Sequence, residues 1–157
     1  MAGAALAAKA LPDQLPLAVG HGDYAARNMF VDGRGRLVVF DPMPRWGVPR
    51  YEDLCRFLIG LRLLGLQLHS RGAAYSQHEL ERIEGNVISA YYADTEAPLD
   101  QIRCYELLIL LDKWSALVDG PEGGLRARIR TASVELASGY LSRQARRLLQ
   151  LADSPGG

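Results

Sequence analysis

Oxygen-bearing side chains that suit metal ions and phosphate gather in the first third of the chain. Asp23 follows His21 and Gly22, and Asn28 and Asp41 come after it. Carboxylate and amide oxygens suit Mg²⁺, a hard ion that takes few protein ligands and completes its shell with phosphate and water. A second carboxylate nearby can orient a hydroxyl group and accept its proton as the bond to phosphorus forms. These residue types therefore indicate chemistry at phosphorus.

A β-hairpin is the element that would position these side chains. Residues 29–31 (MFV) and 36–40 (RLVVF) are rich in strand-forming residues, and residues 32–35 (DGRG) between them hold two glycines, which favour a turn. Apolar residues fall on both faces of this hairpin. We therefore expect the hairpin to be covered on both sides.

The register of the hairpin decides which residues meet. Pairing Val31 with Arg36 places Asn28 at the open end of the hairpin, with Asp41 just beyond the second strand. Asp23 lies on the loop that leads into the first strand. The sequence thus predicts that two carboxylates and one amide converge on a single edge.

The remaining elements are mostly helical. A short strand is predicted at residues 16–20, before the loop. After the hairpin the apolar spacing changes to that of helices, with Gly and Pro as breakers. Helices are expected over about 51–70, 77–92, 98–119 and 125–151. The predicted fold class is α+β, mostly helical, with a small central β-hairpin.

The segment HGDYAARNMFVDGRGRLVVFD, followed by RYEDL, resembles the catalytic half of the aminoglycoside phosphotransferase and choline kinase-like family. That family shares the protein-kinase fold, and its pattern is H-G-D-x-x-x-x-N, a short hairpin, a metal-binding Asp and an Asp-Leu pair that opens a helix. The resemblance covers residues 16 to about 60. It implies that the chain is the C-terminal lobe of an ATP-dependent small-molecule kinase.

The resemblance also implies a role for each residue of the motif. Asp23 would be the catalytic base, and Asn28 and Asp41 would hold Mg²⁺. His21 and Gly22 would shape the catalytic loop. Asp53 would be a structural anchor at a helix start, where an acid also suits the helix dipole.

Arg27 departs from the family pattern. It precedes Asn28 at a position where the family commonly has a small residue. A guanidinium group there could pair with phosphate or with a carboxylate, so Arg27 is a candidate for support of the catalytic loop.

The family's nucleotide lobe has no counterpart in the sequence. A glycine-rich loop and a strand lysine would bind the ATP phosphates, but no GxGxxG precedes His21, and Lys9 and Lys113 both fall in helical contexts. The cofactors implied are therefore ATP and Mg²⁺, with the nucleotide-binding residues unassigned. The isolated chain is expected to show little or no kinase activity.

The expected organisation follows from this resemblance. Residues 1–15 would be a helical remnant or tail, 16–152 a kinase-like C-terminal lobe, and 153–157 a tail. Within the lobe, 16–45 hold the catalytic loop and hairpin, and 51–151 form a helical subdomain. A separate nucleotide lobe or a protomer would cover the exposed apolar face, and a small molecule with a hydroxyl group would be the acceptor.

Two other functions remain open at this point. A metal-dependent phosphoesterase would use the same His and Asp residues, but two-metal hydrolases need further ligands, and only His69 and His78 remain. A non-catalytic binding module could use the Arg-rich last helix as its contact surface. Arg126 and Arg130 share one face of that helix.

Composition limits the other possibilities. The 157 residues hold 18 basic and 18 acidic side chains, which gives no global field toward nucleic acid or anionic lipid. No apolar run reaches the ~20 residues needed to cross a bilayer. Cys55 and Cys104 fall in apolar helical patterns and are expected to be buried thiols. We therefore expect neither nucleic acid nor membrane as a partner, and a cytoplasmic location.

Overall fold

The computed structural model describes residues 11, 14–63, 65–93, 95–118 and 124–153. The predicted N-terminal remnant at 1–15 and the tail at 153–157 therefore lie largely outside the described residues. So do the side chains of residues 124–136, which include Arg126 and Arg130 of the predicted contact surface.

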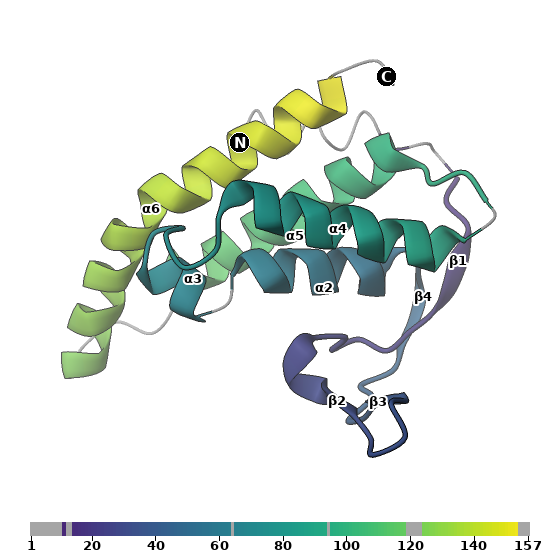
Figure 1. The fold of residues 1–157 in the computed structure, drawn as a ribbon. Coiled ribbons are helices and arrows are strands. Elements are labelled where there is room, and N and C mark those ends of the chain that lie inside the picture. The colour runs from purple at the N-terminus through teal and green to yellow at the C-terminus, as the bar shows by residue number, and fades with distance from the viewer. Residues whose placement is uncertain (1–10, 12–13, 64, 94, 119–123, 154–157) are drawn as a thin grey trace.

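The fold is α+β and mostly helical, as predicted (Figure 1). The elements run in the order β1 (Leu17–Gly20), η1 (Ala26–Asn28), β2 (Met29–Val31), β3 (Leu37–Val39), β4 (Arg45–Pro49), α2 (Glu52–Arg62), α3 (Gly65–His69), α4 (Gln77–Tyr92), α5 (Leu99–Val118) and α6 (Gly124–Asp153). In Figure 1 the strands lie at one side of the packed helices, and the β2–β3 hairpin lies below α2.

The helices agree with the sequence pattern except at one break. The predicted helix at 77–92 is α4, which begins with a capping box between Ser76 and Glu79. The helix predicted over 51–70 is instead two helices, α2 and α3. Gly65 lies at the break, where its low helix propensity favours an interruption.

Leucine, isoleucine and tyrosine side chains of the helices form the core. Cys55 and Cys104 are both buried within it, as predicted, and burial raises the pKa of the Cys55 thiol well above its ordinary value. The largest apolar side chains of this core that are fully buried are Tyr51, Leu54, Leu58, Ile59, Ile102, Leu107, Leu110, Leu141 and Leu148. This shared core joins α2, α4, α5 and α6.

A network of charged and polar side chains is also buried among these helices. Arg62 donates to a carboxylate oxygen of Glu84, and its Nη1 donates to Gln144 Oε1 at 3.0 Å. Arg103 contacts Glu84 as well and donates to Glu106 Oε2 at 2.8 Å. Residues from four helices are thereby tied together inside the helical body.

The hairpin exists, but its predicted register is off by one residue. Val31 pairs with Leu37 rather than with Arg36, and Met29 pairs with Val39. The turn is one residue longer than predicted because Asp32 Oδ1 accepts hydrogen bonds from the backbone amides of Arg34 and Arg36.

A second two-stranded sheet was not predicted. β4 pairs antiparallel with β1, with Leu17 opposite Pro49 and Gly20 opposite Arg45. Pro44 and Pro49 argue against a central strand, but an edge position in a two-stranded sheet tolerates them. This pairing brings the chain that follows the hairpin back to the start of the loop at His21.

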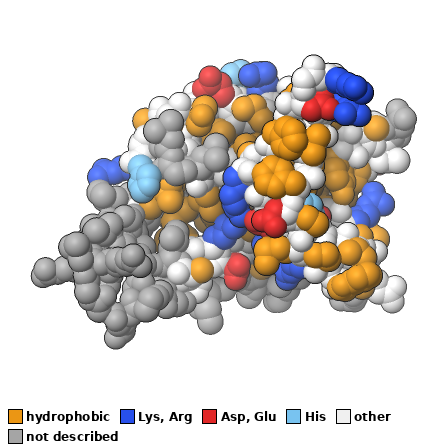
Figure 2. All heavy atoms as spheres, turned by 90° about the horizontal axis from the view of Figure 1, so that it is seen from below, with side chains coloured by type: hydrophobic (Ala, Val, Ile, Leu, Met, Phe, Trp, Pro, Cys, Tyr) orange, Lys and Arg blue, Asp and Glu red, His pale blue; other side chains and the backbone are white. Residues whose placement is uncertain are grey.

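The expectation that the hairpin is covered on both faces is wrong for the described chain. Phe30 is 52% exposed, Val31 65% and Leu37 58%, so the described elements cover less than half of each of these side chains. Figure 2, which views the molecule from the hairpin side, shows hydrophobic side chains gathered in patches around a few charged groups. Among the described helices, none is long and apolar enough to cross a membrane.

Candidate functional site

Asp53 fixes the start of the loop that carries the candidate site. It lies in the first turn of α2, and its two carboxylate oxygens accept the backbone N–H groups of His21, at 2.5 Å, and Gly22, at 3.1 Å. Charge-assisted hydrogen bonds of this kind are stronger than neutral ones. This contact agrees with the role of anchor that was predicted for Asp53.

Gly22 occupies a position that other residues cannot take without a shift of the backbone. Its φ of +82° lies in the left-handed region, and a Cβ atom there would stand 1.9 Å from the carbonyl oxygen of Met43. The Met43 amide in turn donates to the carbonyl oxygen of His21 at 2.8 Å. The loop and the segment after Asp41 are therefore held in close backbone contact.

Asn28 holds Asp23 from a buried position. It ends η1, and its Nδ2 donates at 2.8 Å to Asp23 Oδ2 and at 2.8 Å to the Asp23 carbonyl oxygen. An amide nitrogen does not bind metals, so Oδ1 is the atom of Asn28 that can serve as a ligand. The predicted proximity of Asp23 and Asn28 is present in the structure.

Asp23 is held as a carboxylate by several groups. The hydrogen bond from Asn28 and then that from Arg27 lower the pKa of Asp23 below its ordinary value of 3.8, and the positive charges of Arg27 and Lys113 add to this. Arg27 Nη2 donates to the second carboxylate oxygen, Oδ1. Asp23 is therefore ionised at neutral pH, the state in which a carboxylate can accept a proton.

Asp41 lies between two points where the backbone is tied. On one side the Phe40 amide donates to the Asn28 carbonyl oxygen at 3.1 Å, and on the other Met43 bonds to His21. These hydrogen bonds bring the backbone of Asp41 next to the loop that carries Asp23 and Asn28. We call Asp23, Asn28 and Asp41 the loop cluster. In the described part of the chain, no hydrogen bond or ion pair is made by the exposed Asp41 carboxylate.

The backbone of Asp41 is itself unusual. Its φ is +57°, a region that non-glycine residues rarely adopt, although Asp tolerates it better than most. Strained positions of this kind persist where the surroundings impose them, and they often occur at functional sites. The two flanking backbone ties are the surroundings that impose it here.

His21 contributes packing rather than hydrogen bonds. Its ring meets the ring of Tyr24 edge to face at 5.8 Å between centroids, and neither ring nitrogen has a partner among the described residues. Tyr24 in turn packs against Phe57 of α2. The ring of His21 is therefore held by packing, and its predicted role in shaping the loop stays a prediction.

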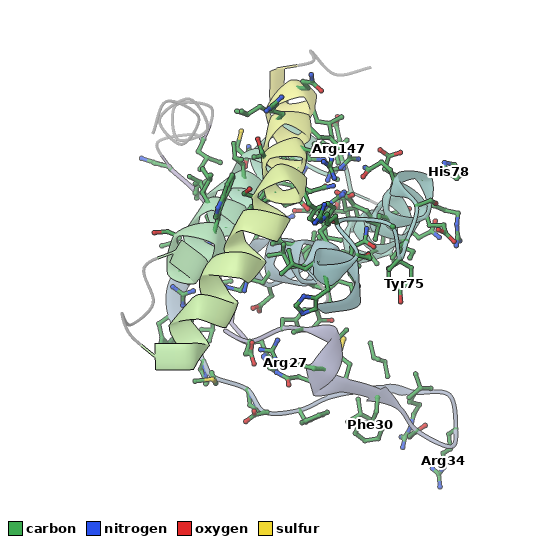
Figure 3. All side chains as sticks on the ribbon, turned by 90° about the vertical axis from the view of Figure 1, so that its left-hand side faces the viewer. Arg27, Phe30, Arg34, Tyr75, His78 and Arg147 are labelled. Carbon is green, nitrogen blue, oxygen red and sulfur yellow. The ribbon has the colours of Figure 1, made fainter. Side chains whose placement is uncertain are left out.

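Lys113 is the residue that the sequence analysis missed. It lies on α5, far along the chain from the loop, yet its charge acts on Asp23. No local pattern marks it, because Lys113 and Asp23 are far apart in the sequence. By contrast, Figure 3 shows His78 well away from Arg27, and both His69 and His78 are exposed.

An apolar cavity of about 290 Å³ lies behind the loop, between the hairpin and the helices. Its walls come from the loop, the hairpin, α2 and α4, and none of them carries a charge. The lining residues are Tyr24, Met29, Leu37, Leu54, Phe57, Val87, Ala90 and Tyr91. The polar side chains of the candidate site, Asp23, Asn28 and Asp41, therefore do not line this cavity.

The chain was compared with protein-family models, curated proteins and solved structures, and no significant match was found in any of the three.

Proposed function

We propose that this chain is the catalytic lobe of an ATP-dependent small-molecule kinase, related to the aminoglycoside phosphotransferase and choline kinase-like family with its protein-kinase-like fold. The complete enzyme would transfer the γ-phosphoryl group of ATP to a hydroxyl group of a small molecule. The observation that carries the proposal is the pair of contacts made by Asn28 to Asp23, on a loop whose backbone Asp53 fixes.

The donor set fits a magnesium ion that is completed by phosphate and water. Asn28 Oδ1 and the Asp41 carboxylate would hold the ion, and both belong to the same loop cluster. The described residues contain no group of three or more His, Cys, Asp and Glu side chains that could hold a metal. A site with one amide and one carboxylate agrees with Mg²⁺, which is commonly bound by few protein ligands together with substrate phosphates.

The chain's own residues account for the remaining steps. Asp23, kept ionised by Asn28 and Arg27, would orient the acceptor hydroxyl and take its proton as the oxygen attacks phosphorus. Asp53 keeps the loop backbone in place during that step. The metal, when bound, would neutralise charge on the phosphates.

No nucleotide-binding residue is assigned by this proposal. The glycine-rich loop and the strand lysine are not among residues 1–157. Phosphotransfer is therefore expected only with a nucleotide lobe supplied in the same chain or by a partner, and the purified chain should turn over little ATP. ATP-dependent phosphorylation by the chain alone, abolished by Asp23→Ala, would contradict this part of the proposal.

The metal site is the part that the chain can test directly. Mg²⁺ is titrated into ¹⁵N-labelled protein, and the backbone amide signals of residues 21–45 are followed by NMR. Saturable shifts are expected at Asn28 and Asp41, and Asp41→Asn should weaken them strongly. Asp100→Asn, which changes an exposed acid on α5, is the matched control and should leave the titration unchanged. Absence of shifts in the wild-type protein at millimolar Mg²⁺ would overturn the metal assignment.

A non-catalytic binding module is the second candidate. The exposed side chains of the hairpin, Phe30, Val31 and Leu37, favour it because exposed apolar groups in a cluster often mark interaction sites. Saturable Mg²⁺ binding that depends on Asp41 would favour the kinase lobe, since a binding module has no need of it. The phosphoesterase is the least supported reading, because His69 and His78 lie on the surface of the helical body.

A further inference from the structure

The two carboxylate oxygens of Asp23 are held in different ways. Oδ2 accepts a hydrogen bond from Asn28, which is 6% exposed and also binds the Asp23 carbonyl oxygen. Oδ1 accepts a hydrogen bond from Arg27, whose side chain is 69% exposed. One oxygen is therefore anchored from inside the protein, and the other is paired with a surface side chain.

Arg27 differs from the other arginines of the loop and hairpin in its partner. Arg36 is paired with Asp32 at the hairpin turn, and Arg45 is paired with the buried Glu52 of α2 at 2.5 Å. Arg34 is exposed at the tip of the hairpin, far from Arg27 in Figure 3. Among the described residues 14–63, Arg27 is the arginine whose partner is the proposed base.

An exposed ion pair is easily opened. Its Coulomb attraction is screened by water, and the long side chain of Arg27 must be ordered to make it. A phosphate group offers a stronger partner, because a guanidinium group can donate two parallel hydrogen bonds to its oxygens. Loss of the Arg27 contact would not displace Asp23, since Asn28 still holds Oδ2 and the backbone.

We propose that Arg27 binds the phosphoryl group at this site and that it leaves Asp23 Oδ1 to do so, which uncovers the oxygen that receives the acceptor proton. The inference rests on the proposed function. In the resting chain Arg27 covers the base, and in the loaded site its positive charge lies on the phosphate. No bond is made or broken in this exchange, since it replaces one ion pair with another.

Lys113 strengthens the positive potential at the same place. The positive charge of Lys113 on α5 also lowers the pKa of Asp23, although less than the contacts of Asn28 and Arg27 do. The carboxylates of Asp41 and Asp23 would repel a polyphosphate, and bound Mg²⁺ would offset that repulsion. We therefore expect the polyphosphate to bind most tightly when Mg²⁺ is present.

The test uses the purified chain with two probes, Mg²⁺ and inorganic tripolyphosphate, followed by calorimetry and by the Arg27 Nε–Hε signal in NMR. Arg27→Met is expected to weaken tripolyphosphate binding by about tenfold or more, the value of a hydrogen bond to a charged group. The same variant should bind Mg²⁺ alone as well as the wild type or better, because a nearby positive charge is removed. Arg27→Lys should restore part of the tripolyphosphate affinity.

The matched control is Arg34→Met, which removes an exposed arginine of the same hairpin and should change neither titration. Equal tripolyphosphate binding by the wild type and Arg27→Met, or no binding by either, would overturn the inference. Equal losses of Mg²⁺ and tripolyphosphate affinity in Arg27→Met would indicate a merely structural role and would also overturn it. Arg27-dependent tripolyphosphate binding in a wild-type chain that binds no Mg²⁺ would support the inference and overturn the metal assignment instead.

Discussion

Charged side chains are used differently in the two parts of this molecule. In the helical body Arg62 and Glu84 are almost fully buried, and they pair with each other or with further buried groups. In the loop, Asp53 accepts backbone amides, while Asp23 and Arg27 pair at the surface. The buried charges pair with one another and hold the helices together, whereas the ionised groups of the loop lie where a ligand can reach them.

Apolar side chains show the same division. The helical body buries its leucines and isoleucines, and the hairpin leaves Phe30 and Leu37 half exposed or more. The stability of the chain therefore comes mainly from the helices, because area removed from water is the dominant favourable contribution to folding. The loop cluster depends instead on a small number of specific polar and backbone contacts.

The largest effect is expected from breaking the buried charge network. Glu84→Gln removes a negative partner of both Arg62 and Arg103, and it leaves Arg62 without its paired carboxylate inside the protein, while Arg103 keeps Glu106. We expect the free energy of unfolding to fall by about 3–5 kcal/mol. Urea denaturation followed by circular dichroism measures it.

The control for this experiment is Glu96→Gln, an exposed acid before α5, which should change stability by no more than about 0.5 kcal/mol. A similar small change in Glu84→Gln would mean that the network does not stabilise the helical body. The comparison between the two regions would then fail.

The next effect separates backbone strain from crowding in the loop. Gly22 and Gly35 both have positive φ, +82° and +75°, but a Cβ atom at Gly22 meets the Met43 carbonyl oxygen while one at Gly35 meets nothing within 4 Å. Gly35→Ala should cost about 1–2 kcal/mol, the cost of left-handed backbone for a residue with a side chain. Gly22→Ala should cost clearly more and should shift the amide signals of residues 21–23 and 41–45.

The measurement is the urea midpoint together with amide chemical shifts of both variants. Equal losses would show that the close approach of Met43 is not a constraint, and the backbone contact that places Asp41 near the loop would lose its main support. The helical amide signals of Gly22→Ala should stay near their wild-type positions, since that region folds around its own core.

A smaller effect is expected at Asp53. Asp53→Asn keeps the size of the side chain, but its one amide oxygen can take the place of only one of the two carboxylate oxygens, and its NH₂ group cannot accept the other backbone N–H of His21 and Gly22. We expect a loss of about 1–2 kcal/mol. Hydrogen exchange should quicken at the amides of His21 and Gly22, and Asp100→Asn, in the first turn of α5, should leave these rates unchanged.

The sequence predicts much of this arrangement and misses the rest for identifiable reasons. Helix periodicity and breakers are local signals, so α4 and α5 agree with the expected ranges. The hairpin register depends on how Asp32 bonds the turn, and a one-residue change in that turn moves every pair. The strand β4 was not predicted because Pro44 and Pro49 argue against a strand. Its pairing with β1 depends on tertiary contacts, which no local pattern shows.

The residues of the candidate site also divide into those that the local sequence predicts and one that it does not. Asp23, Asn28 and Asp53 lie within a short motif and a helix start, and the structure joins them by hydrogen bonds. The contact of Arg27 with Asp23 is also local, since the two residues are four positions apart in the sequence. Lys113 could not be found, because its effect on the pKa of Asp23 joins two parts of the chain that are distant in sequence.

The smallest expected effect concerns pH and tests whether the buried charges are all equally well paired. Glu106 is fully buried, its Oε1 has no hydrogen-bond partner among the described residues, and burial raises its pKa above the ordinary 4.5, although the charges of Arg103, Arg62 and Arg147 act to lower it. The folded state then binds a proton at Glu106 more tightly than the unfolded state does. Between the ordinary and the raised pKa, this residue makes stability fall as pH rises.

Glu106→Gln removes that contribution, because glutamine does not titrate. The variant should therefore lose less stability than the wild type between pH 4.5 and pH 7, measured as the urea midpoint across that range. Glu96→Gln, exposed to solvent, serves again as the control and should keep the wild-type slope. If stability depends on pH in Glu106→Gln as it does in the wild type, Arg103 compensates the charge of Glu106 fully. Glu106 is then as well paired as the other buried charges.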